Sequence, residues 1–254
     1  RGIHRPVKNV WTREESTIGH CKRHPMVVRS RWGARSDGML VAVEVEMIAD
    51  GGAYVSTSNK VLRNASITVT GPYEFPNAKL DSYAVYTNNL FSGAFRGFGA
   101  TQGGTVAEIM MNKLAAALEM DPVELRLKNI LDENKLLTVG TTIPGGVSLD
   151  TVINETARAG GWKRGAAAHR QYKSGQAMPK IVSGQGFGVG FKNVGFSYDY
   201  RDVSWATVEL RGQGEIEEAI VTIDGADLGQ GHHTAMAQIA AEALDIDMKR
   251  VKMR

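Results

Sequence analysis

Cysteine is almost absent from this sequence: Cys21 is the only one among 254 residues. A single cysteine excludes an intrachain disulfide and any zinc or iron–sulfur site built from several cysteines, and it is compatible with a reducing compartment. Long apolar runs are missing too, because no stretch approaches the roughly 20 residues of a membrane-spanning helix and no hydrophobic signal segment opens the chain. We therefore expect a cytoplasmic protein without membrane contact.

A strong net charge is also lacking. The formal charge is +3, which is too small to indicate nucleic-acid binding. Hydrophobic residues make up 43% and charged residues 22% of the chain, as in ordinary globular proteins. The length suits one large domain or two smaller ones. The sequence opens with Arg1 and Gly2, which are not an initiator, and we expect a piece of a longer polypeptide.

Apolar and polar residues alternate in several stretches, which is the pattern of half-buried strands. Residues 25–33 and 39–47 flank a Ser-Asp-Gly turn and predict a hairpin. The other predicted strands are 7–14, 79–87, 181–194, 203–210 and 216–223. Apolar residues at helical spacing predict helices over 105–120, 122–131, 148–157 and from 232 onward, whereas 54–75 is predicted to be irregular.

These elements predict an α+β fold with mixed sheets and packed helices in two lobes. We expect a first lobe over residues 1–161, a linker over 162–180 and the start of a second, truncated lobe over 181–254. In both lobes strands come first, and a glycine turn then leads into a helix rich in alanine, methionine and isoleucine.

The most distinctive stretch is the first glycine turn, residues 93–104 (GAFRGFGATQGG), which runs directly into a predicted helix. Glycines let backbone N–H groups approach a ligand, a helix N-terminus favours negative charge, and the Arg96 guanidinium matches phosphate oxygens. The turn therefore indicates an anionic ligand, although an ordinary surface loop with a salt-bridged arginine is the alternative. The following helix is expected to bury one stripe of side chains: Val106, Ile109, Met110, Leu114 and Leu118.

The second glycine turn, residues 227–234 (DLGQGHHT), opens another helix. A large anionic ligand held between two helix N-termini would use two such turns. His232 and His233 are adjacent and diverge on a helix, so we do not expect them to bind a metal. The expected buried stripe of this helix is Met236, Ile239, Ala240, Ala243 and Leu244.

Three sets of residues carry a resemblance to a known family. They are Ala94-Phe95-Arg96-Gly97-Phe98-Gly99 with Gln102 and Glu108, Gly229-Gln230-Gly231 with Thr234 and residues 238–242, and spacers that include Arg23-His24-Pro25 and Asp121-Pro122 through Arg126, Lys128 and Asn129. With them the sequence resembles the molybdenum-binding subunit of the xanthine dehydrogenase and aldehyde oxidoreductase family, the molybdenum hydroxylases. The likeness extends over nearly the whole chain and implies the molybdopterin-binding fold of that family.

The resemblance implies a role for each glycine turn. A pterin dithiolene would hold the molybdenum, so no metal-binding side chains are expected. The residues nearest the metal would be Ala94, Phe95 and Arg96, and Gly97 would also bind the cofactor. Phe98 would form an aromatic wall for a flat substrate, unless it is a core aromatic. Hydrogen bonds to the pterin and its phosphate would come from Gly229, Gln230 and Gly231.

The resemblance leaves substrate contacts and catalysis only partly defined. Arg63 and Asn64 are the two candidates for facing the substrate, and we assign Asn64, which puts purine recognition in doubt. A second aromatic wall would be Phe191 or Phe196. The family's catalytic glutamate lies downstream of the second glycine turn, so we assign no catalytic residue here. The glutamates that do not match it are Glu14, Glu15, Glu44, Glu46 and Glu108.

By resemblance, this chain would be the central part of a bacterial, multi-subunit enzyme. It would help to bind molybdopterin, in its cytosine dinucleotide form, while iron–sulfur clusters and FAD would lie on partner subunits or domains. The complete enzyme would hydroxylate an N-heterocycle, purine or aldehyde with water, and the chain alone would be inactive. The alternatives are a non-catalytic interaction module without cofactor and an ordinary nucleotide-binding enzyme, although residues 93–104 lack the Gly-Lys-Ser/Thr ending of a P-loop.

Overall fold

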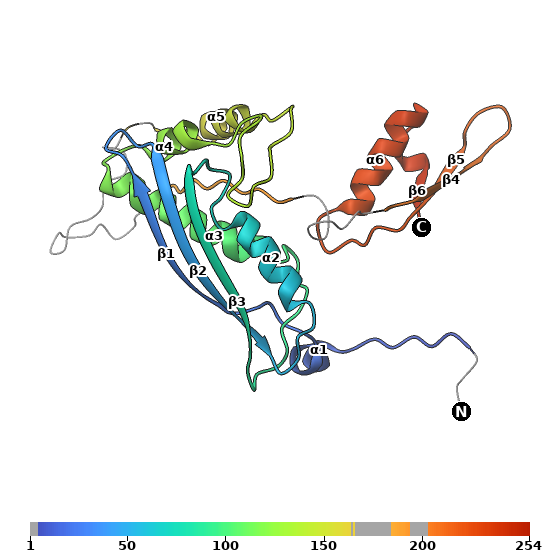
Figure 1. The fold of residues 1–254 in the computed structure, drawn as a ribbon. Coiled ribbons are helices and arrows are strands. Elements are labelled where there is room, and N and C mark those ends of the chain that lie inside the picture. The colour runs from blue at the N-terminus through green and yellow to red at the C-terminus, as the bar shows by residue number, and fades with distance from the viewer. Residues whose placement is uncertain (1–4, 164, 166–183, 194–202) are drawn as a thin grey trace, which may run out of the picture. The chain divides into compact units, whose positions relative to one another are not determined.

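The computed structural model describes residues 5–163, 165, 184–193 and 203–254, whose fold is shown in Figure 1. The chain divides into two compact units, Arg1–Val194 and Gly195–Arg254, and each is considered by itself. Both combine helices with a mixed sheet, which confirms the predicted α+β class. None of the helices in the described ranges is long and apolar enough to cross a membrane.

The first unit is built on a three-stranded sheet with the order β1 (Met26–Ala34), β2 (Leu40–Gly52) and β3 (Asn77–Tyr86). β1 and β2 pair antiparallel, which confirms the predicted hairpin, and β3 pairs in parallel with β2. Along β2, Val43, Val45 and Met47 are buried, whereas Glu44 and Glu46 between them are half-exposed. The alternation seen in the sequence therefore marks the two faces of the central strand.

Two helices, α2 (Ser58–Thr68) and α3 (Ala100–Ala117), lie on one face of this sheet (Figure 1) and enclose the main core with it. The two helices approach each other closely at two glycines, Gly99 at the N-terminus of α3 and Gly103 within it. A Cβ on Gly99 would lie 2.1 Å from the carbonyl oxygen of Val61, and a Cβ on Gly103 would lie 2.5 Å from Oγ1 of Thr68. These glycines therefore set the distance between the helices.

The buried face of α3 differs from the predicted stripe. Its buried residues are Gly103, Ala107, Met111 and Ala115, whereas Ile109 is 49% exposed. The prediction was wrong for Ile109, whereas Val106, Leu114 and Leu118 are partly buried against the main core as expected. The fully buried positions are mostly small because α2 approaches α3 closely there.

Helix α4 (Pro122–Asn129) begins as predicted, with the Asp121 carboxylate accepting the N–H of Val123 over 2.8 Å. At its end, the Asn129 side chain accepts the N–H of Leu40 over 2.9 Å and donates to the carbonyl oxygen of Gly38 over 2.9 Å. These bonds attach α4 to the β1–β2 hairpin. The predicted helix after Ser148 is confirmed as α5 (Leu149–Ala159).

Two regions in the first half of the chain were predicted wrongly. The predicted strand 7–14 is not one, because α1 (Arg13–Gly19) begins there. Thr12 and Glu15 form a capping box in which each side chain accepts the other's backbone N–H, and this pairing starts a helix despite the short apolar run before it. The region 54–75 contains α2, which is buried through Val61 and Leu62 in spite of its many Ser, Thr and Asn residues.

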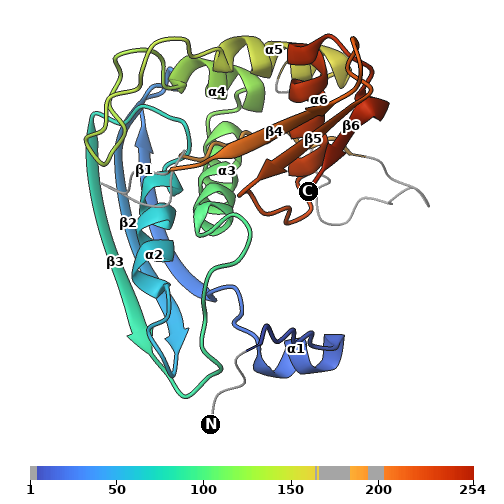
Figure 2. The ribbon, with the colours of Figure 1, turned by 90° about the vertical axis from the view of Figure 1, so that its right-hand side faces the viewer.

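The second unit has a three-stranded sheet with the order β4 (Ala206–Arg211), β5 (Glu218–Ile223) and β6 (Val251–Met253). The predicted antiparallel pair β4–β5 is confirmed, and β6 adds to β5 in parallel. Figure 2 shows α6 (His232–Leu244) beside these strands; it buries Ala237 and Ala241, while Ile239 of the predicted stripe is 59% exposed. Both units thus follow the order strand, antiparallel strand, helix, parallel strand.

The boundary between the units lies close to, but not at, the predicted lobe boundary. The predicted linker, 162–180, falls mostly outside the described residues and stays a prediction. Residues 184–193, which we assigned to the second lobe, belong to the first unit and have no regular structure where a strand was expected. Phe187 and Val189 pack against the buried cluster of Val123, Ile153 and Ala157.

Candidate cofactor-binding site

The first glycine turn connects β3 to α3 and is fixed at its start by the rest of the first unit. The N–H of Ser92 donates to the carbonyl oxygen of Gly51 over 2.9 Å, and the N–H of Gly93 donates to that of Lys22 over 2.9 Å. A Cβ on Gly93 would lie 2.9 Å from Sγ of Cys21, so a larger residue would not fit there. The segment before β1 therefore lies directly against the turn.

The middle of the turn has three consecutive residues in the left-handed region. Their φ angles are +91° at Gly97, +47° at Phe98 and +97° at Gly99. Two hydrogen bonds close the turn: Phe98 N–H to the carbonyl of Phe95 over 2.7 Å, and Ala100 N–H to that of Gly97 over 2.9 Å. The chain then enters α3 without a side-chain cap at Gly99, and such a helix N-terminus favours an anion.

The predicted residues of this turn differ in exposure. Ala94, Phe95 and Arg96 are exposed, Phe98 is half-buried and Gly99 is buried. The three residues predicted to lie nearest the metal are therefore at the surface of the first unit, where a ligand can reach them. The half-buried ring of Phe98 is compatible with a wall for a flat substrate.

Arg23 contacts the turn from the segment before β1, and its role was not predicted. Its guanidinium donates to the carbonyl oxygen of Arg96 over 2.6 Å and to Oγ1 of Thr101 over 3.2 Å. It also lies 4.7 Å from the centre of the Phe95 ring, a cation–π contact. The Arg23-His24-Pro25 triplet carries part of the family resemblance, but nothing in its local pattern reveals these partners.

His24 is buried beneath the turn. Its Nε2 is 2.8 Å from Oγ of Ser58, and its carbonyl oxygen accepts a hydrogen bond from Nε2 of Gln102 over 3.2 Å. Burial lowers the pKa of His24, although the Asp50 carboxylate opposes this shift. Within the described part of the chain, Nδ1 of His24 and Oε1 of Gln102 are buried without a hydrogen-bond partner. Buried polar atoms without a hydrogen-bond partner are uncommon in folded proteins.

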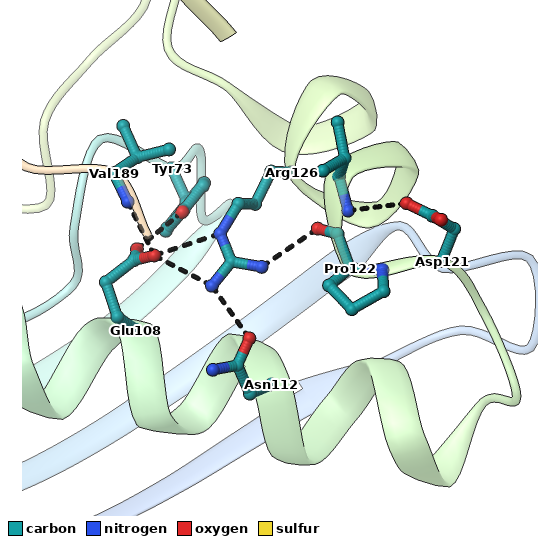
Figure 3. Close-up of polar contacts among 8 residues, drawn as sticks. Tyr73, Glu108, Asn112, Asp121, Pro122, Arg126 and Val189 are labelled. Carbon is teal, nitrogen blue, oxygen red and sulfur yellow. Dashed lines mark hydrogen bonds and ion pairs between the residues drawn. The ribbon is translucent and has the colours of Figure 1, made fainter. Parts of the chain in front are cut away.

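Glu108 on α3 has a structural role, as Figure 3 shows. Its Oε2 accepts hydrogen bonds from Nε of Arg126 over 2.9 Å and from the N–H of Val189 over 2.7 Å, and its Oε1 accepts the hydroxyl of Tyr73 over 2.6 Å. Burial, above all, raises the pKa of Tyr73. A carboxylate engaged in this way is unsuited to acting as a mobile base, which agrees with our not assigning it that role.

The second glycine turn is held by its own side chains. The Asp227 carboxylate accepts the N–H of Gly229 over 2.7 Å, and this bond, with those from the N–H groups of His233 and Gly231, lowers the pKa of Asp227. The Gln230 carboxamide accepts the N–H of Leu228 over 2.5 Å and donates to the carbonyl of Ala226 over 2.9 Å. At Gly231, with φ +76°, the space around a Cβ position is open, so a ligand can approach the backbone.

The remaining predicted site residues lie outside the two glycine turns. On α2, Arg63 is exposed whereas Asn64 is fully buried, and Phe191 packs against the cluster of Ile67, Leu131 and Leu137. Phe196 lies outside the described residues. Across the described ranges, no group of three or more His, Cys, Asp or Glu residues could hold a metal ion.

A separate cavity of about 510 Å³ lies beside the C-terminal half of α3. Its lining includes Asn112, Glu119, Trp162 and Phe187. It contains none of the described residues that we assign to a cofactor or substrate, so it does not belong to the candidate site.

Comparisons with known proteins agree with the resemblance. The profile of the molybdopterin cofactor-binding domain matches residues 1–130, and a second molybdopterin cofactor-binding domain profile matches residues 155–254. The large molybdopterin subunit of nicotinate dehydrogenase from Eubacterium barkeri is 46% identical over 145 residues, which are 57% of this chain and 34% of that protein. A probable xanthine dehydrogenase subunit from Bacillus subtilis is 32% identical over 250 residues, 94% of this chain and 31% of that protein.

Solved structures show the same fold. Quinoline 2-oxidoreductase from Pseudomonas putida 86 aligns with a TM-score of 0.69 at 24% identity, covering 96% of this chain and 32% of that one. The aldehyde oxidoreductase of Desulfovibrio desulfuricans aligns with a TM-score of 0.68 at 25% identity, covering 92% and 25%. The chain thus spans about a third of the relatives it matches in sequence, 34% and 31% of their lengths.

Proposed function

Since this chain belongs to the molybdopterin cofactor-binding domain family of the molybdenum hydroxylases, we propose that it forms part of the cofactor site of a larger oxidoreductase. That enzyme hydroxylates a carbon of an N-heterocycle, purine or aldehyde with oxygen from water. The observation that carries the proposal is the first glycine turn, where three left-handed residues lead into the uncapped start of α3 beside the exposed Arg96.

In this proposal the first glycine turn lies at the metal end of the cofactor. Ala94, Phe95, Arg96 and Gly97 contribute backbone groups and a guanidinium, since the first three are exposed. Phe98 orients a flat substrate by stacking. Asn64 is buried within α2, which supports Arg63 as the better candidate for direct substrate contact from that helix.

The second glycine turn binds the pterin side of the cofactor in this proposal, and the residues present fit that role. Asp227 and the Gln230 carboxamide hold the turn in shape through bonds to the Gly229 and Leu228 N–H groups, while the backbone at Gly231 is open to approach. Gly229 and Gln230 would bind the pterin through atoms that do not take part in these hydrogen bonds within the turn. The cytosine dinucleotide form of the cofactor is part of the proposal.

When bound, the cofactor supplies the redox-active metal, and this chain's residues bind and orient it. Burial lowers the pKa of the His24 imidazole, which favours its neutral form, and Nε2 of this ring lies 2.8 Å from Oγ of Ser58. The proton-accepting glutamate, the iron–sulfur clusters and the FAD lie outside these 254 residues, on the remaining polypeptide or on partner subunits of a cytoplasmic enzyme. The two lobes, 1–161 and 181–254 with a linker between them, remain part of this proposal.

Cofactor content after a single substitution tests the proposal. In the complete natural polypeptide that contains this chain, Arg96→Ala should lower molybdenum and releasable nucleotide per polypeptide by roughly tenfold or more, because a hydrogen bond to a charged group is lost. Arg29→Ala is the matched control, since its side chain is 68% exposed and pairs with Glu46 on the outer sheet face. Equal cofactor content in the two variants would contradict the proposed role of Arg96 in cofactor binding.

The isolated chain should not hydroxylate substrates, because it lacks the proton acceptor and the electron-transfer groups. Turnover by the isolated 254 residues at the rate of the whole enzyme would contradict this. The alternative function, an interaction module without cofactor, predicts neither molybdenum nor nucleotide in the purified complete protein.

A further inference from the structure

We propose that Arg23 is a positioning residue that holds the first glycine turn in its ligand-binding shape. The inference rests on the proposed function of that turn and adds a residue to it. Arg23 bridges the turn, because one guanidinium nitrogen binds the carbonyl of Arg96 and another binds Oγ1 of Thr101. The two acceptors lie on either side of the left-handed residues 97–99.

The bridged segment needs external support. A non-glycine residue such as Phe98, with φ +47°, costs about 1 kcal/mol or more in this region and persists only where its surroundings hold it. The hydroxyl of Thr101 also lies against Gly97, where a Cβ would be only 2.1 Å from Oγ1. By fixing Thr101 and Arg96 together, Arg23 closes the turn across its strained part.

Arg23 is itself held in place by its neighbours. The carbonyl of Lys22 accepts the N–H of Gly93 over 2.9 Å, and the carbonyl of His24 accepts Nε2 of Gln102 over 3.2 Å. The backbone on both sides of Arg23 is therefore bonded to the two ends of the turn. These two bonds fix the backbone that carries the Arg23 side chain beside the turn.

The bridge depends on the chemistry of arginine. The guanidinium is a planar fork that can serve two acceptors while stacking over the Phe95 ring. A lysine ammonium has no such fork and cannot stack in the same way. The positive charge also lies beside the residues proposed to meet an anionic cofactor, so it favours the same ligand that the turn binds.

Amide hydrogen exchange tests this inference in the complete natural polypeptide, produced without molybdate so that ligand occupancy does not differ between variants. In Arg23→Met, the amides of residues 94–102 should exchange at least about tenfold faster, since two hydrogen bonds from a charged group are lost. Arg23→Lys should lie between Arg23→Met and the native protein. Arg29→Met, in the following strand β1 and paired with Glu46, should leave these amides unchanged.

The outcomes separate this inference from the proposed function. Exchange of residues 94–102 at the native rate in Arg23→Met would overturn it. Faster exchange with native molybdenum content, in protein produced with molybdate, would support the positioning role and overturn the cofactor role of the turn. If Arg23→Met does not fold, as judged by the amides of β2, Thr101→Val removes one acceptor with a similar shape and should accelerate exchange by a smaller factor; an unchanged rate there overturns the inference.

Discussion

Arg126 of α4 and Glu108 of α3 form a buried ion pair, with Nε and Nη2 of the guanidinium 2.9 Å and 2.7 Å from the same carboxylate oxygen. The side chain of Arg126 is fully buried and that of Glu108 is 17% exposed. Nη1 of Arg126 donates to the Pro122 carbonyl oxygen, and Nη2 also donates to the Asn112 side chain, so all three guanidinium nitrogens are hydrogen-bonded (Figure 3). The pair therefore joins α3, α4 and the segment containing Val189.

Removing one partner of this pair should destabilise the first unit strongly. Glu108→Gln leaves the Arg126 guanidinium buried without its counter-charge, and we expect a loss of about 3–5 kcal/mol in the free energy of unfolding. Urea denaturation followed by circular dichroism measures it. Glu155→Gln is the control, because Glu155 pairs with Arg158 while both side chains are largely exposed, at 59% and 75%. A loss no larger than that of the control would contradict a structural role for Glu108.

Adjacent glycines in α3 should respond oppositely to alanine. A Cβ at residue 103 would lie 2.5 Å from Oγ1 of Thr68 and 2.8 Å from the carbonyl oxygen of Ala65, so Gly103→Ala should cost about 1–3 kcal/mol by forcing α2 and α3 apart. No atom lies within 4 Å of the Cβ position at Gly104, so Gly104→Ala should stabilise the helix by about 0.5–1 kcal/mol. The thermal midpoints of the two variants, compared with the native protein, decide this; shifts of the same sign would be inconsistent with the packing described.

The buried His24 should make stability depend on pH. Because its pKa in the folded protein lies below that of an unfolded histidine, about 6.5, the unfolded chain takes up the proton first as the pH falls. The contribution of His24 is therefore complete above about pH 7 and is lost as the pH falls below about 6.5, until the folded state is also protonated. Denaturation between pH 7.5 and 5.5 should show a weaker pH dependence in His24→Gln than in the native protein. An identical dependence in both would contradict a neutral buried imidazole.

Local patterns in the sequence predicted much of the fold. The alternation of Val43, Val45 and Met47 with Glu44 and Glu46 marks β2 correctly because one face of the sheet is buried and the other is not. The start of α4 at Asp121 was equally recognisable, since an N-cap and a following proline act within one turn of chain.

The errors arose where long-range contacts or capping outweighed the apolar pattern. α2 is stabilised by burial against the sheet and by its close approach to Gly99 and Gly103, which composition does not reveal. The capping box of Thr12 and Glu15 starts α1 in a stretch whose apolar residues indicated a strand. In each case contacts that the periodicity of the segment does not show decided the structure.

The sequence indicated the first glycine turn of the candidate site but not the residue that contacts it from outside. The first glycine turn was found from its glycines and Arg96, and its backbone indeed has three left-handed residues. Arg23 was not given a role, because the residues it contacts are 73 and 78 positions away in the chain. The two glycine turns belong to different units, so their meeting at one cofactor stays a proposal.

The position of molybdenum in the complete protein tests the central claim most directly. Crystals of the complete natural polypeptide, purified with its cofactor, should give an anomalous difference peak at the molybdenum absorption edge beside the backbone of Ala94, Phe95 and Arg96. Density for the pterin should lead from this peak to the backbone at Gly231. A molybdenum peak remote from the first glycine turn, or a fully folded and active enzyme with no molybdenum peak, would contradict the account.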